Sequence, residues 1–122
     1  MATRVTVLIV EDEVLVRMAL ADHLEDVGYH VLEANDADEA IEVLEREDDV
    51  RVIFTDIDMP GSMDGLKLAA AVADRWPPIR IIITSGRRMV EITDIPSGSV
   101  FFMKPYSHRL IERQIGEMLT SR

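Results

Sequence analysis

The chain contains no cysteine, and its basic residues are far fewer than its acidic ones. Without cysteine, neither a disulfide nor a thiolate metal site can form, and the composition fits a reducing cytoplasm. Lysine and arginine number 13 against 23 aspartates and glutamates, which gives a formal net charge of −10. A surface of that sign repels phosphate backbones, so we expect no direct contact with DNA or RNA. It favours basic protein surfaces and bound cations as partners.

Long hydrophobic runs are also lacking. The N-terminal run Val5–Val10 is too short for a signal peptide, and acidic residues follow it. No run approaches the roughly 18 residues that a membrane span requires. The 122 residues contain no linker, repeat or low-complexity segment and have the length of one domain. We therefore expect residues 1–122 to form a single cytoplasmic domain, with no membrane span and no output domain.

Short apolar, β-branched runs alternate with segments of helical periodicity. The runs predict strands at Val5–Val10, Tyr29–Ala34, Val50–Thr55, Ile79–Thr84 and Ser99–Met103. The periodic segments predict helices at Glu13–Val27, from Asp36, at Asp64–Arg75 and from Ser107. The segment 86–98 is the least regular, since Met89, Val90 and Ile92 allow only a short helix there. A strand–helix unit repeated five times implies an α/β fold, with a parallel sheet covered by helices on both faces.

The apolar spacing also predicts the buried face of each helix. In the first helix this face carries Val16, Leu20, Leu24 and Val27, and Gly28 ends the helix. In the helix after the third strand it carries Leu66, Ala69, Ala70 and Ala73.

Polar side chains follow four of the predicted strands at the point where each strand ends: Glu11-Asp12, Asp56, Thr84 and Lys104. Ligands of open α/β sheets bind at the carboxyl ends of strands, so we expect these side chains to meet at one edge. Carboxylates about 4 Å apart repel by roughly 1 kcal/mol in water and about 4 kcal/mol near a protein surface. Mg²⁺, which takes oxygen ligands, would relieve that repulsion and neutralise a phosphoryl group. Asp56 is then the predicted nucleophile, Lys104 a second positive charge and Thr84 a hydroxyl donor.

In this order and at these intervals, Glu11-Asp12, Asp56 with Met59-Pro60, Thr84 and Lys104-Pro105 resemble the receiver domain of two-component response regulators. The resemblance covers essentially the whole chain. It implies the flavodoxin-like receiver fold, with a five-stranded parallel sheet of strand order 2-1-3-4-5. It also implies that a histidine kinase or a histidine phosphotransfer protein phosphorylates Asp56. The phosphorylated chain would then switch a downstream protein target, alone or as a homodimer.

The resemblance assigns individual roles at the site. Asp12, Asp56 and the backbone carbonyl of Asp58 would bind Mg²⁺ directly, and Glu11 would act mainly through water. Thr84 and Phe101 would switch together on phosphorylation. Phe101 lacks the hydroxyl of the tyrosine found in many relatives, so this switch would be a change of packing alone.

The sequence departs from the family pattern in the loop after the predicted nucleophile. Asp64-Gly65 follows Met59-Pro60 one residue late, because Gly61-Ser62-Met63 lie between them. We therefore expect a longer or bulged loop at this point.

Each of these residues also has an ordinary structural interpretation. Glu11-Asp12 could cap the following helix, Thr84 could be a β-branched strand end, and Lys104-Pro105 could terminate a strand. The side chain of Asp58 fits an ordinary turn residue. The presence of the full set in order favours a site that accepts a phosphoryl group.

Two other functions stay open from the sequence. Asp56 and Asp58 have the Asp-x-Asp spacing of a haloacid-dehalogenase-like, Mg²⁺-dependent phosphatase. That family places its other acids downstream, however, whereas the acidic pair here lies upstream. The other alternative is a receiver-like module that binds partners without phosphorylation. Because nothing needed for phosphorylation is missing, we expect a signalling switch and not an enzyme.

Overall fold

A computed structural model describes residues 4–61, 63–87 and 91–120 of the chain. Strands and helices alternate through these residues and end with a helix. The elements are β1 (Thr6–Val10), α1 (Val14–Asp26), β2 (His30–Ala34), α2 (Ala37–Arg46), β3 (Val50–Asp56), α3 (Gly65–Arg75), β4 (Arg80–Ser85), the 3₁₀ helix η1 (Ile92–Asp94), β5 (Val100–Met103) and α4 (His108–Thr120). Among the described residues, no helix combines the length and the apolar character needed to cross a bilayer.

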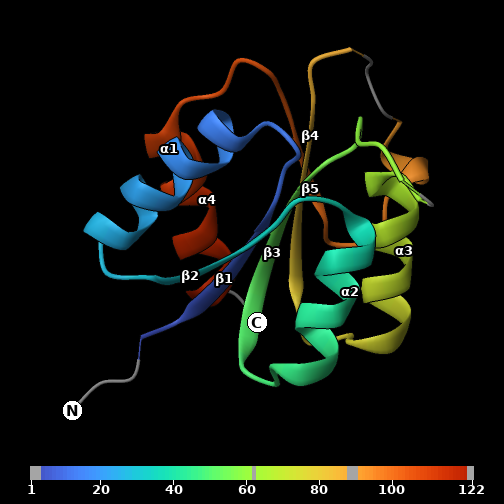
Figure 1. Cartoon of the computed structure of the whole chain (residues 1–122), viewed down its shortest axis with the longest axis horizontal. Helices are drawn as coiled ribbons and strands as arrows, with labels where there is room; N and C mark the ends of the chain where they lie inside the picture. The colour runs from blue at the N-terminus through green and yellow to red at the C-terminus, as the bar shows by residue number, and fades with distance from the viewer. Residues whose placement is uncertain (1–3, 62, 88–90, 121–122) are drawn as a thin grey trace.

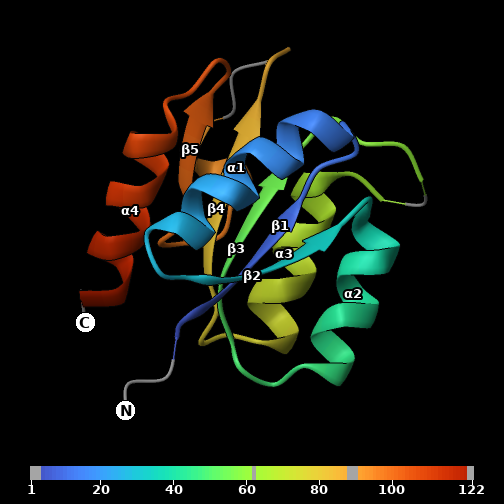
Figure 2. The same ribbon diagram turned by 60° about the vertical axis from the view of Figure 1, so that its left-hand side comes forward.

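The strands form one parallel sheet of order β2-β1-β3-β4-β5. Helices α1 and α4 cover one face, and α2 and α3 cover the other (Figure 1). The predicted fold class and strand order are therefore confirmed. The strand arrows point toward the same edge of the sheet (Figure 2), so the carboxyl ends of β1, β3, β4 and β5 lie together there.

Each face of the sheet has its own buried core, because successive residues of a strand point to opposite faces. Leu8, Ile53 and Ile83 pack with α2 and α3 on one face. Ile9 and Phe54, with Ile82 beside them, pack with α1 and α4 on the other. Burial on both faces explains why the strands read as continuous apolar runs in the sequence.

Helix α1 ends as predicted at Gly28, which has a left-handed φ of +109°. The Gly28 and Tyr29 amides donate to the carbonyls of Glu25 and Leu24, both at 3.0 Å, and this pattern closes the last helical turn. The predicted buried face is correct at Leu20 and Leu24, which are fully buried. It is wrong at Val27, which is 44% exposed because the helix has already ended there.

Helix α3 is rotated relative to the prediction. Its buried residues are Gly65, Leu68, Ala69 and Val72, and Ala70 is exposed. Gly65 lies directly against the backbone of Asp56, and the residues at i+3, i+4 and i+7 from it then face the sheet. The contact of one glycine, which apolar periodicity does not reveal, thus sets the rotation of the helix.

The connection between β4 and β5 contains little regular structure in its described part. The short helix expected in segment 86–98 is a single 3₁₀ turn, Ile92–Asp94, closed by a capping box between Glu91 and Asp94. Met89 and Val90, on which that expectation also rested, lie outside the described residues. Pro96 follows this turn and disfavours helical backbone at the residue before it. The fourth strand–helix unit is therefore shorter than the sequence pattern suggests.

Candidate functional site

The ends of β1 and β3 bring three carboxylates together. Val10 pairs with Thr55 across these neighbouring strands, which places Glu11-Asp12 beside Asp56. One carboxylate oxygen of each of the three residues lies within 4.8 Å of the others. Strand β3 extends one residue further than predicted, so Asp56 is its last residue and is only 3% exposed. Three carboxylates at this spacing form an all-oxygen donor set that suits Mg²⁺.

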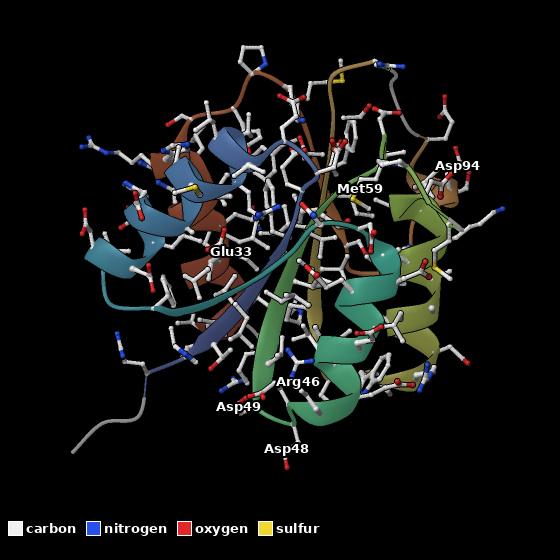
Figure 3. The ribbon with its side chains drawn as sticks, viewed as in Figure 1. Glu33, Arg46, Asp48, Asp49, Met59 and Asp94 are labelled. Carbon is white, nitrogen blue, oxygen red and sulfur yellow. The ribbon has the colours of Figure 1, made fainter. Side chains whose placement is uncertain are left out.

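Some acidic residues lie far from this edge. Asp48 and Asp49 lie in the turn before β3, at the opposite end of the sheet from Met59, which follows the site (Figure 3). The acidity of the chain is therefore spread over its surface, while three of its carboxylates converge at the carboxyl edge.

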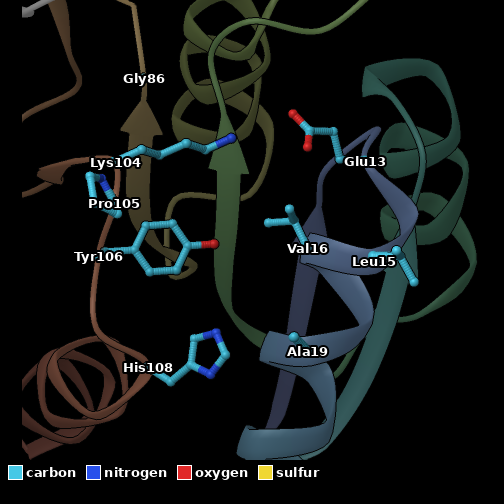
Figure 4. Close-up of a pocket in the computed structure, with 9 residues that line it drawn as sticks. All are labelled: Glu13, Leu15, Val16, Ala19, Gly86, Lys104, Pro105, Tyr106 and His108. Carbon is cyan, nitrogen blue, oxygen red and sulfur yellow. The ribbon is translucent and has the colours of Figure 1, made fainter.

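Lys104, which directly follows β5, reaches the acidic group formed by Glu11, Asp12 and Asp56. Its Nζ lies 2.9 Å from Glu11 Oε1 and 3.1 Å from Asp56 Oδ2. Strand β4 lies between β5 and β3, so the side chain must pass over the end of β4 (Figure 4). Gly86 borders that path, since a Cβ atom there would lie 3.4 Å from Lys104 Cδ. The lysine thus bridges two carboxylates that come from different strands.

Burial and charge act against each other at this site. Desolvation raises the pKa of Asp56 and of Glu11, and the hydrogen bonds and charge of Lys104 offset part of the rise. Burial lowers the pKa of Lys104, but its two carboxylate partners outweigh burial and hold that pKa above its usual value. The lysine therefore stays a cation at neutral pH, and the buried carboxylates carry a solvation cost that a cation or a phosphoryl group could change.

The loop after β3 folds closely over Asp56. The backbone N–H of Asp58 donates to Asp56 Oδ1 at 3.3 Å, and the N–H of Gly65 donates to the Ile57 carbonyl at 3.0 Å. A Cβ atom at Gly65 would lie 2.0 Å from the Asp56 carbonyl oxygen, so only glycine fits. Gly61, with a φ of +110°, turns the chain before Asp64. Gly65 therefore keeps its contact with Asp56 despite the extra residue in the loop.

Thr84 and Ser85, the last two residues of β4, point to opposite faces of the sheet. The Thr84 hydroxyl donates to the Phe102 carbonyl at 2.8 Å, on the side of α1 and α4. The Ser85 hydroxyl donates to Asp58 Oδ2 at 2.7 Å, beside the acidic group. The structure thus brings a hydroxyl to the site from Ser85, and it turns the hydroxyl of Thr84 away.

Phe101 lies on the same face of the sheet as Ser85. It is partly buried against the core beneath α2 and α3, whereas Phe102 packs into the other core. Thr84 and Phe101, which the resemblance to receiver domains pairs in a switch, are therefore on opposite faces. The polar Thr84-Ser85 strand end is visible in the sequence, but which hydroxyl faces the site depends on strand parity and the position of Asp58.

Arg17 is a further residue that the sequence does not single out. Its guanidinium donates to the Glu11 carbonyl at 2.8 Å and to Asn35 Oδ1 at 2.7 Å, and it forms an ion pair with Glu33 at 2.9 Å. Through these bonds α1 holds the backbone of Glu11 against the end of β2. We regard Arg17 as a residue that positions Glu11 through its backbone carbonyl.

An apolar pocket of about 610 Å³ opens beside Lys104, between α1 and the start of α4 (Figure 4). Leu15 and Val16 line it from α1, and Tyr106 and His108 line it from the other side. Burial, with nearby Glu11, raises the pKa of Tyr106 to about 12, so its phenol stays neutral. The acidic group is thus flanked by a surface suited to apolar contact.

Comparison with known proteins gives consistent matches. The family model described as response regulator receiver domain matches residues 7–113. The chain is 38% identical to the transcriptional regulatory protein PdtaR of Mycobacterium tuberculosis over 83% of its own length, and it spans half the length of that protein. It is 32% identical to the response regulator receiver protein CpdR of Brucella abortus, over 93% of this chain and 95% of that one. A crystal structure of a CheY-like receiver domain protein from Methanospirillum hungatei superposes with a TM-score of 0.86 at 25% identity, covering 96% of this chain and 94% of that one.

Proposed function

The chain belongs to the response regulator receiver domain family, and we propose that it accepts a phosphoryl group on Asp56 from a histidine kinase or a phosphotransfer protein. The receiver domain is a signalling domain and not a catalytic enzyme family, so the phosphatase alternative is set aside. The observation that carries the proposal is the bridge from Lys104 to Glu11 and Asp56, beside three carboxylates whose oxygens lie within 4.8 Å of one another.

The proposed transfer uses the residues at the edge in separate roles. An Asp56 carboxylate oxygen attacks the phosphorus of a phosphohistidine, the new O–P bond replaces the P–N bond, and the bonding electron pair leaves with the imidazole nitrogen. Lys104, held as a cation by its two partners, pairs with a transferred phosphoryl oxygen. Mg²⁺, when bound, neutralises the phosphoryl oxygens. The oxygens that would hold it belong to Asp12, Asp56 and the Asp58 carbonyl, with Glu11 acting through water.

We assign the sensing of the phosphoryl group to Ser85 in place of Thr84. Ser85 is buried at the end of β4, and its hydroxyl already faces the loop that follows Asp56. Phe101 lies on the same face, beside Ile83 and against the core under α2 and α3, so a shift of Ser85 can reach the surface around β5 through a change of packing on that face. This route uses the face on which the β4–β5 connection carries only a 3₁₀ turn in its described part.

We place the phosphodonor on the surface formed by α1 and the pocket beside Lys104. A donor imidazole must approach Asp56 from the open carboxyl edge, and this surface borders that edge. Leu15, 82% exposed, and Val14 and Met18 beside it present apolar side chains that no other element of the described structure covers. A helical, histidine-bearing partner would bury these side chains while its imidazole reaches the nucleophile.

The test of the proposed function is phosphorylation by a small donor. The protein is incubated with Mg²⁺ and acetyl phosphate and then weighed by intact-protein mass spectrometry. We expect one phosphoryl adduct on the wild type and on Asp48→Asn, a control at the opposite end of the sheet, and none on Asp56→Ala. A wild type without an adduct, or an equal adduct on Asp56→Ala, contradicts the proposal. The first of these results would favour a module that binds partners without phosphorylation.

A further inference from the structure

The hydrogen bond between Ser85 and Asp58 joins two segments that lie beside the proposed phosphoryl acceptor, Asp56. Ser85 ends β4, and Asp58 lies in the loop that carries the nucleophile. The hydroxyl donates to Asp58 Oδ2 at 2.7 Å and accepts the Arg87 N–H at 3.1 Å. Asp58 is also tied to the nucleophile itself, because its N–H donates to Asp56 Oδ1 at 3.3 Å. One short network therefore connects the acceptor oxygen, the loop and the end of β4.

A phosphoryl group on Asp56 would compete with Asp58 for Ser85. A serine hydroxyl has one proton to donate, and in this structure it donates to the carboxylate of Asp58. Phosphoryl oxygens are strong acceptors that carry close to two negative charges. Their charge also repels the Asp58 carboxylate, which starts within hydrogen-bonding reach of the same hydroxyl. Phosphorylation therefore favours breaking the Ser85–Asp58 bond and turning the hydroxyl toward Asp56.

We propose that the Asp58 carboxylate is a latch that holds the Ser85 hydroxyl in the unphosphorylated protein and competes for it with the phosphoryl group on Asp56. The inference rests on the proposed function and adds a residue that sets how readily the switch moves. Asp58 is a positioning residue in this role, because it acts on the phosphoryl group through Ser85. The interpretation of its side chain as an ordinary turn residue is thereby replaced by one with a consequence for signalling.

The latch makes the effect of Asp58 depend on Ser85. Asp58→Asn keeps the size of the side chain but replaces a charged acceptor with a neutral, weaker one. We expect it to speed phosphorylation by acetyl phosphate roughly tenfold, the factor that a weakened charge-assisted hydrogen bond can supply. In a Ser85→Ala background only the removed negative charge remains to act, so the gain falls to about twofold. Asp58→Ala, which offers no acceptor, should match or exceed Asp58→Asn in the presence of Ser85.

Asp64 supplies the matched control. It lines the same open groove as Asp58, and it caps α3 by accepting the Lys67 N–H at 2.9 Å, a role that asparagine also fills. Asp64→Asn removes one negative charge from the groove but leaves the Ser85–Asp58 bond in place. Its effect on the phosphorylation rate should be the same with Ser85 and with Ser85→Ala.

A second measurement follows the latch without phosphorylation. In ¹H–¹⁵N spectra of unphosphorylated Asp58→Asn, the Ser85 and Arg87 amide peaks should move toward their positions in phosphorylated wild type, because part of the population is already released. Equal rate gains in both Ser85 backgrounds, or peaks that stay at their unphosphorylated positions, overturn the latch while leaving phosphorylation of Asp56 intact. A wild type and variants that all fail to take up phosphate overturn the proposed function itself, and the latch with it.

Discussion

Near the carboxyl edge, the two faces of the sheet differ in the elements that cover them and in the hydrogen bonds that the end of β4 makes. Helices α1 and α4, each of 13 residues, cover one face, and there Thr84 bonds to a strand carbonyl. On the other face, beside α2 and α3, Ser85 bonds to a loop carboxylate and the β4–β5 connection carries a 3₁₀ turn in its described part. Two adjacent residues of one strand thus make different connections: Thr84 joins β4 to β5, and Ser85 joins the sheet to the loop after β3.

This difference indicates which face can respond to a phosphoryl group. Segments with few buried apolar contacts open at a lower free energy than packed helices do. Gly65, Ser85 and Phe101 all belong to the face of α2 and α3, where the loop after Asp56 also lies. We therefore expect the face of α1 and α4 to keep its conformation on phosphorylation, and the face of α2 and α3 to change its conformation.

The largest expected effect on stability comes from substituting Gly65, on the face covered by α2 and α3. In Gly65→Ala the new methyl group would lie 2.0 Å from the Asp56 carbonyl oxygen, so the backbone of α3 or β3 must shift. We expect the free energy of unfolding to fall by about 3 kcal/mol, because a rigid backbone contact cannot be relieved by a side-chain rotation. The measurement is urea-induced unfolding followed by circular dichroism. Phosphorylation by acetyl phosphate should be slowed as well, since Asp56 itself is displaced.

Gly116 on the other face is the matched control for that substitution. It lies within α4, and an added Cβ atom there meets no neighbour within 4 Å. Gly116→Ala should stabilise the protein by about 0.5–1 kcal/mol through helix propensity alone. If Gly65→Ala were as stable as Gly116→Ala, the close approach of α3 to Asp56 would not constrain the fold.

The next effect separates the two hydroxyls of β4. Thr84→Val removes the hydroxyl that donates to the Phe102 carbonyl, so we expect a loss of about 0.5–1.5 kcal/mol in stability and little change in phosphorylation rate. Ser85→Ala removes the donor to the Asp58 carboxylate, and we expect a clear change in the phosphorylation rate. Unfolding curves and phosphorylation kinetics on the same two variants test this. An equal change of the phosphorylation rate in Thr84→Val and Ser85→Ala would show that the response to the phosphoryl group is not confined to the face of Ser85.

The sequence is sufficient to predict the sheet and most of the site. Buried β-branched runs determine the strands, and the rule that ligands bind at the carboxyl ends of parallel strands brings Glu11, Asp12, Asp56 and Lys104 together. The strand order 2-1-3-4-5 came from resemblance to the receiver family, because periodicity alone does not order strands. The acidic group and its lysine could be predicted because each residue directly follows or ends a strand.

The parts that the sequence does not predict depend on contacts between segments. The rotation of α3 about its axis follows from the close contact of Gly65 with the backbone of Asp56. Apolar periodicity along the helix does not reveal a contact with another segment. The choice between Thr84 and Ser85 depends on which way the last residue of a strand points, and a shift of one residue reverses it. The exposure of Val27 follows from the point where α1 ends, which sequence patterns locate only to within a few residues.

The smallest expected effect concerns the charged edge that both faces share. Desolvation raises the pKa of Asp56 above its value in the unfolded chain, so the folded protein binds the proton more tightly than the unfolded one does. Stability from this group is fully present below the unfolded value, near pH 4, and is lost as the pH rises through the folded pKa. Asp56→Asn stays neutral throughout, so it should be more stable than wild type by about 1 kcal/mol at pH 7 and no more stable at pH 4.

The measurement is a series of urea unfolding curves between pH 4 and pH 8 in a chelating buffer, with Asp22→Asn, an exposed substitution on α1, as the control that should show no such pH-dependent gain. Adding Mg²⁺ at pH 7 should narrow the difference in stability between wild type and Asp56→Asn, because a cation binds the three carboxylates of the wild type more tightly than the two that remain in the variant. If Asp56→Asn were less stable than wild type at pH 7, the ion pair with Lys104 would outweigh the desolvation of Asp56. The charged residues at the carboxyl edge would then stabilise the fold, and any destabilisation linked to the proposed site would have to come from the loop after β3, on the side of α2 and α3.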